Sequence, residues 1–198
     1  MMIAFGHTIF LDKNPATFTN DELFDFCVKN KNLRIERDVN QNLVIMAPVG
    51  GGSGFRELEI LTEVNIWKRR SKLGKSFSSS TGFLLPNGSM RSPDACWLSD
   101  ERWATVPDSE KEKFLPVTPD FVVEVRSNSD RVNDLKTKMQ EWIENGVRLA
   151  WLIDAKTEQV FIYRENGSID IIEGFDNILN GETVMPDFNF DLRQLRMD

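Results

Sequence analysis

Cysteine and histidine are scarce in this sequence. Cys27 and Cys96 are the only cysteines, and their wide separation argues against a disulfide framework and a cysteine-ligated zinc site. The only histidine, His7, lies near the N-terminus and away from every motif described below. Histidine-ligated zinc and histidine-based hydrolysis are therefore poorly supported, and Ser127 and Ser129 lack the histidine that a serine triad needs.

Long hydrophobic runs are also absent. No stretch approaches the ~18 consecutive apolar residues that a membrane-spanning helix needs. The first seven residues, MMIAFGH, have neither the basic nor the apolar region of a secretory signal. Together with the low cysteine content, these features predict a cytoplasmic protein with no membrane segment.

Positive charge is in the minority. The chain has 24 Lys and Arg against 31 Asp and Glu, a formal net charge of −7. Most of the non-specific affinity for nucleic acids comes from cationic contacts to phosphate, so this balance argues against an extended nucleic-acid-binding surface. A metal ion held by acidic ligands, or a local basic patch, would reconcile the charge with a nucleic-acid substrate.

The chain has the length and composition of one globular domain. It contains 198 residues, of which 40% are hydrophobic and 28% charged. Apolar periodicity predicts helices interleaved with strands, so we expect one α/β domain over residues 1–198. The expected helices cover 19–30, 55–73 and 130–145. The expected strands cover 33–38, 42–47, 75–80, 82–85, 94–98, 121–125, 148–153 and 159–164.

One helix start and three segments outside these elements have particular compositions. Thr19 and Glu22 have the spacing of a capping box at the start of the first helix. The glycine run at 48–54 lacks the Gly-Lys-Ser/Thr ending of a phosphate-binding loop, so we interpret it as a flexible turn before a helix. Residues 100–114 are charged and irregular, which predicts a surface excursion, and the chain from 168 onwards is rich in β-type residues and turns.

Two carboxylates stand out because strands surround them. Glu124 interrupts an apolar β-branched run, and Asp94 opens a strand behind Pro93. Isolated carboxylates are costly to bury, whereas two of them at neighbouring strand ends can hold a hard divalent cation. A second interpretation stays open, in which Glu124 pairs with Arg126 or another base and Asp94 only caps a turn.

Further candidates lie on the two longer helices. Lys138 lies beside the apolar stripe of the 130–145 helix, from where its ammonium can reach inward to the strand ends. Glu57 shares a face with the apolar residues of the 55–73 helix and needs a partner or a metal there. Glu59 lies on the opposite side of the same helix and ranks lower by geometry.

Several blocks of residues together resemble a known family. The chain is similar to a large bacterial family of restriction-endonuclease-like proteins within the PD-(D/E)XK nuclease superfamily, over residues 50–164. The blocks that carry the resemblance are STGF at 80–83, LPNG at 85–88, SPDACW at 92–97, PDFVVEVRSNSD at 119–130, KMQE at 138–141, NGV at 145–147 and WLID at 151–154.

The resemblance implies a fold and a domain layout. It implies a restriction-endonuclease-like mixed sheet flanked by helices. Residues 50–164 would form the nuclease-like core, residues 1–48 an N-terminal helix and hairpin, and residues 165–198 a β-rich tail.

The resemblance also implies roles for individual residues. Asp94 would be the aspartate of the Pro-Asp motif and Glu124 the second acidic residue, with the Val125 carbonyl as a further metal ligand. Glu57 would be the polar residue of the first core helix, with Glu59 as a second candidate for that role.

The motif's lysine is missing from its usual place. Arg126 stands there, and its pKa is too high for a general base. Related nucleases supply this lysine from a neighbouring helix, and Lys138 would take that role here. Asp120 forms a second Pro-Asp pair; we interpret it as the entry to the 121–125 strand rather than as a ligand.

The sequence thus predicts a Mg²⁺-dependent phosphodiesterase that acts on DNA, with Mn²⁺ as a substitute metal. By family analogy we expect a homodimer. One rival is a binding or assembly protein that keeps the fold without cleavage, favoured by the acidic charge and Arg126. A hydrolase of other phosphate esters with the same metal centre stays open as a third interpretation.

Overall fold

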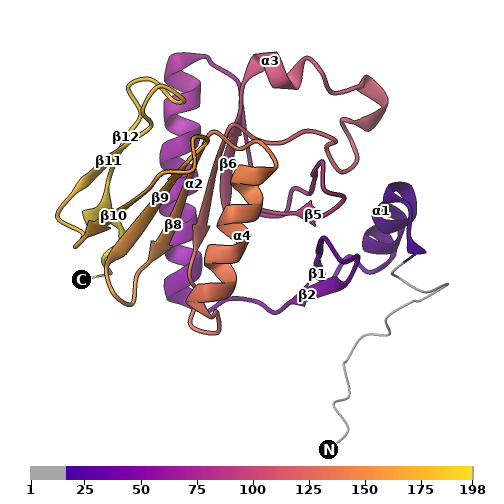
Figure 1. The fold of residues 1–198 in the computed structure, drawn as a ribbon, viewed down its shortest axis with the longest axis horizontal. Helices are drawn as coiled ribbons and strands as arrows, with labels where there is room; N and C mark the ends of the chain where they lie inside the picture. The colour runs from indigo at the N-terminus through magenta and orange to yellow at the C-terminus, as the bar shows by residue number, and fades with distance from the viewer. Residues whose placement is uncertain (1–16, 198) are drawn as a thin grey trace, which may run out of the picture.

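The computed structural model describes residues 17–197. His7 and the first seven residues, which carry no secretory signal pattern, lie outside this range. A six-stranded sheet forms the centre of the molecule, with a helix on each face (Figure 1). Its strand order is β10-β9-β8-β7-β6-β3. The strands are β3 Lys75–Phe77, β6 Ala95–Leu98, β7 Phe121–Val125, β8 Leu149–Asp154, β9 Gln159–Arg164 and β10 Ile169–Glu173.

The sheet is mixed, as predicted. β7 and β8 run parallel, and the other pairs in this sheet are antiparallel. Every residue of β7 is buried, because helices cover both faces of the sheet at that strand. The expected buried strand at 121–125 is therefore confirmed.

Helices α2 and α4 cover opposite faces. Apolar side chains of α2, Gly51–Ser71, pack on the face that carries Phe121 and Val123 of β7. Those of α4, Val132–Glu144, pack on the face that carries Val122. Because side chains alternate along a strand, Glu124 lies on the α4 side. The alternation thus directs the carboxylate of Glu124 towards α4.

A smaller sheet joins the N-terminal part of the chain to the centre. Its strand order is β2-β1-β5-β4, with β1 and β2 forming the predicted hairpin. The strands are β1 Arg34–Arg37, β2 Leu43–Met46, β4 Phe83–Leu84 and β5 Met90–Arg91. Buried Arg37 anchors the hairpin by donating to the carbonyls of Phe18 and Gly88.

The N-terminal helix matches its sequence signal closely. α1 spans Asn20–Lys29, and Thr19 and Glu22 form the complete capping box. Near the other end of the chain, β11 Ile178–Asn180 pairs with β12 Asn189–Asp191, and a short 3₁₀ helix follows at Leu192–Leu195. This tail packs on the α2 face of the main sheet.

Two expectations need correction. The glycine run is not a turn before the second helix, because α2 already begins at Gly51 and continues to Ser71. The 100–114 segment is not wholly irregular, since it contains the helical turns α3, Asp100–Trp103, and Asp108–Glu110. Ser99 caps the first of these turns by accepting a hydrogen bond from the Arg102 amide.

Candidate functional site

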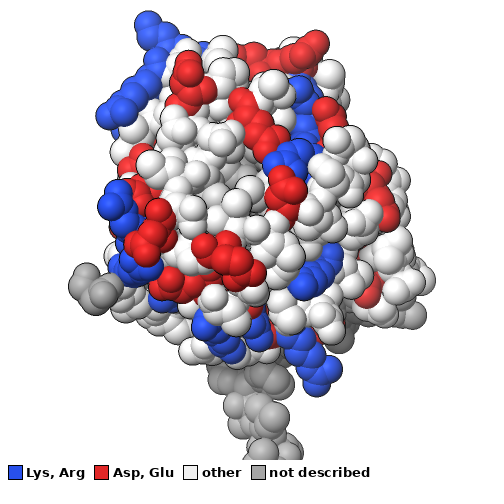
Figure 2. Space-filling model, turned by 60° about the vertical axis from the view of Figure 1, so that its left-hand side comes forward, with Lys and Arg blue, Asp and Glu red and all other residues white. Residues whose placement is uncertain are grey.

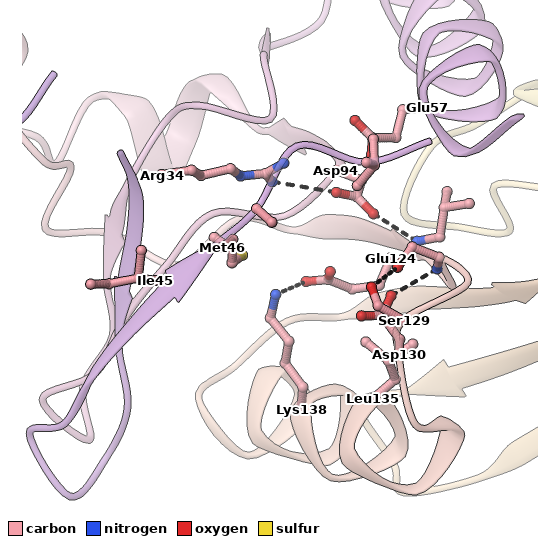
Figure 3. A pocket seen from close by; sticks show the side chains of 14 residues that line it. Arg34, Ile45, Met46, Glu57, Asp94, Glu124, Ser129, Asp130, Leu135 and Lys138 are labelled. Carbon is pink, nitrogen blue, oxygen red and sulfur yellow. Dashed lines mark hydrogen bonds and ion pairs between the residues drawn. The ribbon is translucent and has the colours of Figure 1, made fainter. Parts of the chain in front are cut away.

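A cavity of about 280 Å³ opens at the carboxyl end of β7. The β1–β2 hairpin, the start of α2 and the first half of α4 surround it (Figure 3). Among the residues that line this cavity are Arg34, Met46, Glu57, Asp94, Glu124, Val125, Asp130 and Lys138. The chain thus brings Asp94, Glu124, Val125, Lys138 and Glu57 together at one place, from four different segments.

Asp94 is fixed by a backbone contact to the neighbouring strand. It lies immediately before β6, and its Oδ2 accepts a hydrogen bond of 2.8 Å from the Val125 amide. Its Oδ1 lies 3.4 Å from the guanidinium of Arg34 on β1. Asp94 is only 8% exposed, so this carboxylate is part of the interior rather than a turn cap on the surface.

Glu124 presents one oxygen to α4. Its Oε1 lies 2.8 Å from the Lys138 ammonium and accepts a 2.9 Å hydrogen bond from the Trp142 indole. Lys138 and Trp142 are four residues apart and therefore lie on the same helical face. Both donors use Oε1, and none of residues 17–197 donates to Oε2, so that oxygen is left for the cavity.

The ammonium of Lys138 lies between two carboxylates. Besides Glu124, it contacts the Oε1 of Glu36 at 3.0 Å. Glu36 is buried, and it also pairs with Arg91 at 3.1 Å. Negative and positive side chains therefore alternate through the interior in the order Glu124, Lys138, Glu36 and Arg91. Such a buried network is sustained only because each charge has an opposite neighbour.

Burial dominates the electrostatics of the acidic pair. It raises the pKa of Asp94 to about 6, assisted by the nearby negative charge of Glu57. It raises the pKa of Glu124 to about 7, against the lowering effect of Lys138. Burial also works to lower the pKa of Lys138, but the carboxylates of Glu124 and Glu36 outweigh it and raise that pKa. Without a bound cation, the acidic pair thus resists carrying two full negative charges.

The structure separates the two candidates on α2. Glu57 lines the cavity, and burial raises its pKa, with a further contribution from Glu124. Figure 3 shows Glu57 on the Asp94 side of the site, opposite Lys138. Glu59 is not among the residues that line the cavity. This separation follows the helical wheel, on which the two residues lie on different sides.

Arg126 and Asp120 have partners elsewhere. Arg126 pairs with Asp154 at 2.6 Å rather than with Glu124. Asp120 accepts a hydrogen bond from the Ser99 amide and pairs with Arg102, at the opposite end of β7 from the cavity. Asp120 therefore serves the strand entry, as expected. Glu124 does not pair with Arg126, but it does pair with another base, Lys138, as the second interpretation allowed.

Two residues of β1 were not predicted from the sequence: Arg34, which lines the cavity, and Glu36, which contacts Lys138 from behind it. They alternate with Ile35 along β1, so both side chains lie on the face that meets the cavity and α4. Charged residues at alternate positions of a short strand usually indicate a solvent-facing side. Only the pairing of β1 with β5, which precedes Asp94, places this side against the site.

The site has few side chains for a metal ion. Among the described residues, 17–197, no group of three or more His, Cys, Asp and Glu side chains is arranged to hold one. Asp94 and Glu124 supply carboxylate oxygens, and Val125 lines the same cavity. Mg²⁺ commonly binds through one or two carboxylates and keeps several waters, so this donor set fits a hard cation with few protein ligands.

The face drawn in Figure 2 gives no general sign of nucleic-acid binding. Figure 2 shows a face on which acidic and basic side chains are interspersed, without one continuous basic area. None of the helices between residues 17 and 197 is long and apolar enough to cross a membrane. Because the face in Figure 2 has no continuous basic area, a nucleic acid bound there would depend on individual Lys and Arg side chains or on a bound metal ion.

Comparisons with known proteins give a family and a fold. The sequence model of a family described as "Uma2: Putative restriction endonuclease" matches residues 21–193, which is most of the chain. A crystal structure of a putative nuclease belonging to DUF820 from Anabaena variabilis ATCC 29413 is similar, with a TM-score of 0.68 and 15% sequence identity. The match covers 81% of this chain and 88% of that one, so the mixed α/β fold is shared. No curated protein matches the sequence.

Proposed function

Since this chain belongs to the Uma2 family of putative restriction endonucleases, we propose that it is a Mg²⁺-dependent endonuclease that hydrolyses phosphodiester bonds of DNA. One observation carries the proposal. Asp94, Glu124 and Lys138 come from separate segments and line a single cavity, with the Lys138 ammonium 2.8 Å from Glu124. Two carboxylates with an ammonium beside them are the groups that metal-assisted phosphodiester hydrolysis needs.

The residues present fit a Mg²⁺ ion. Asp94, Glu124 and the Val125 carbonyl would hold it, with Mn²⁺ as a substitute. All of these donors are oxygens, the ligands that hard divalent cations prefer. Burial raises the pKa values of Asp94 and Glu124, and a bound divalent cation would stabilise their charged forms. When bound, Mg²⁺ would lower the pKa of a coordinated water and offset charge on the scissile phosphate.

The chain's own cations would handle the substrate. Lys138 would donate from its ammonium to an oxygen of the scissile phosphate, where negative charge grows during attack. Arg34 lines the same cavity, and its Nε is buried without an acceptor among residues 17–197. The Arg34 side chain as a whole is 30% exposed, and its guanidinium would contact a non-bridging phosphate oxygen in the cavity. Glu57 would orient a water molecule on the Asp94 side.

A second candidate function is binding without cleavage. Lys138 is already paired with both Glu124 and Glu36, and the net charge of −7 opposes the approach of DNA. In that case the domain would keep its fold and serve as a binding or assembly protein.

A plasmid-nicking assay distinguishes the two functions. Supercoiled plasmid is incubated with the purified chain and Mg²⁺ or Mn²⁺, and with Asp94→Asn prepared identically. Metal-dependent nicking by the wild type, lowered at least about 100-fold in the variant, supports the enzyme. Equal nicking by both would identify a contaminating nuclease, and no nicking by either would favour the binding protein. Parallel assays with small phosphate esters test the third interpretation.

Other properties stay predictions. These are the homodimer, the cytoplasmic location, and the division into 1–48, 50–164 and 165–198. Light scattering of the purified chain measures its mass in solution directly. A mass of one chain at assay concentrations would contradict the dimer.

A further inference from the structure

Glu36 lies behind the candidate site rather than in it. Its relative exposure is 2%, and it is not among the residues that line the cavity. A substrate in the cavity therefore cannot touch it. Burying a carboxylate this deeply is costly unless its oxygens are fully paired, so its partners indicate what it does.

The first partner of Glu36 is the ammonium of Lys138. Glu36 is on β1, and its Oε1 lies 3.0 Å from the Lys138 Nζ. Glu124 is on β7, and its Oε1 lies 2.8 Å from the same Nζ. A lysine side chain has four rotatable bonds and one compact charge, so a single carboxylate leaves its end poorly fixed. Carboxylates from two different strands hold the ammonium at one point.

The second partner is the backbone that leads into Asp94. Oε1 of Glu36 accepts a 2.9 Å hydrogen bond from the Ser92 amide. The carbonyl of Ser92 accepts a 3.3 Å hydrogen bond from Arg34, two residues before Glu36 on β1. Strand β1 thus holds both polar groups of the Ser92 backbone, two positions before Asp94.

From these contacts we infer that Glu36 is a positioning residue that aligns Lys138 and the Asp94 segment with one carboxylate. The inference rests on the proposed nuclease function for its catalytic consequence. It makes the β1–β2 hairpin an essential part of the centre, although the motifs of the nuclease-like core begin after it. Loss of this carboxylate would leave Lys138 with Glu124 alone and free the Ser92 amide.

Glu141 provides a matched control. It pairs with Arg91, the same arginine that Glu36 contacts, but from α4 and from the far side of that guanidinium. The contacts of Glu141 include neither Lys138 nor Ser92. Glu36→Gln and Glu141→Gln each remove one negative charge that pairs with Arg91. Only Glu36→Gln also changes a side chain that contacts Lys138 and the Ser92 amide.

The kinetic test compares these variants in the Mn²⁺-dependent nicking assay. Glu36→Gln is expected to lower kcat about tenfold or more with KM changed less than about twofold, because alignment is lost while substrate contacts remain. Glu141→Gln is expected to stay within about twofold of the wild type in both constants. In a Lys138→Met background, Glu36→Gln is expected to cause a smaller further loss than it does in the wild type, since only the contact to the Ser92 amide is left for it to act through. Equal kcat for Glu36→Gln and wild type, or fully multiplicative losses in the double variant, would overturn the inference.

A second measurement does not depend on cleavage. Urea unfolding of the wild type, Glu36→Gln, Lys138→Met and the double variant forms a thermodynamic cycle. If Glu36 holds Lys138, the shifts in midpoint are strongly non-additive; additive shifts would show that the contact carries no coupling and would refute the alignment of Lys138. A wild type that cleaves nothing would remove the proposed function, and this cycle would still decide whether Glu36 fixes the ammonium.

Discussion

Lys138 on α4 and Trp142, one turn further along the same helix, contact the same oxygen of Glu124: the ammonium forms an ion pair with it at 2.8 Å, and the indole donates a 2.9 Å hydrogen bond to it. The carboxylate is therefore fixed from one side, and its other oxygen is left for the cavity. The helix, and not the strand that carries Glu124, thus supplies the lysine whose ammonium lies beside the Glu124 carboxylate. Arg126, which takes the strand position, is directed to Asp154 instead.

Replacing Lys138 tests its catalytic role. Lys138→Met is expected to lower kcat about 100-fold, because a cation that stabilises developing charge is worth several kcal/mol in a buried site. Lys136→Met is the control, since Lys136 lies on the same helix over the ring of Phe161. Single-turnover cleavage of a labelled duplex measures both variants, after circular dichroism has shown that they are folded. Similar losses in the two variants would mean that Lys138 acts only as a general surface cation.

The two glutamates of α2 offer a paired test. Glu57→Gln is expected to reduce metal-dependent cleavage about tenfold, since the carboxylate lies in the cavity and would orient water there. Glu59→Gln is expected to change it less than about twofold, because Glu59 does not line the cavity. The reverse order of effects would assign the helix carboxylate of the family motif to Glu59.

The pH dependence of stability follows from the raised pKa of Asp94. Burial raises it from 3.8 to about 6, so the stabilising contribution of the protonated form is complete below about pH 4 and is lost as the pH rises through 6. Metal-free Asp94→Asn should therefore gain stability relative to the wild type between pH 4 and pH 7, by on the order of 2 kcal/mol. Urea unfolding in the presence of a chelator measures this difference at each pH. A difference that stays constant over this range would contradict the raised pKa.

Trp142 should affect the site as well as the core. Trp142→Phe removes the indole donor to Glu124 and is expected to cost about 1–2 kcal/mol of unfolding free energy and to weaken Mn²⁺ binding severalfold. Trp97→Phe is the control, because the Trp97 indole donates to the Leu73 carbonyl, away from the cavity. Denaturant unfolding and calorimetric titration with Mn²⁺ report the two effects. Equal loss of Mn²⁺ affinity in both variants would indicate a general packing effect.

Local signals in the sequence were sufficient for much of the fold. The capping box of α1 is formed by side chains three residues apart, so neighbouring residues alone determine it. Alternation along β7 and the helical spacing of Lys138 placed Glu124 and Lys138 on facing surfaces. These features depend on contacts within one element or between adjacent elements.

Features that depend on distant contacts were not visible in the sequence. Glu36 and Lys138 are 102 positions apart in the sequence, and nothing near Glu36 indicates that its side of β1 is buried. The early start of α2 is also tertiary in origin, because Gly50 forms no side-chain cap, whereas Arg56 in the first turns donates to the Leu195 carbonyl. Glycine is a poor helix former, so its propensity favours a turn at this point.

Diffraction at the manganese absorption edge, from crystals soaked in Mn²⁺, tests the centre most directly. We expect an anomalous peak at the carboxylates of Asp94 and Glu124, and its disappearance in Asp94→Asn. No peak at this position at saturating Mn²⁺, or a peak of equal height in the variant, would contradict the proposal that these carboxylates form a metal centre.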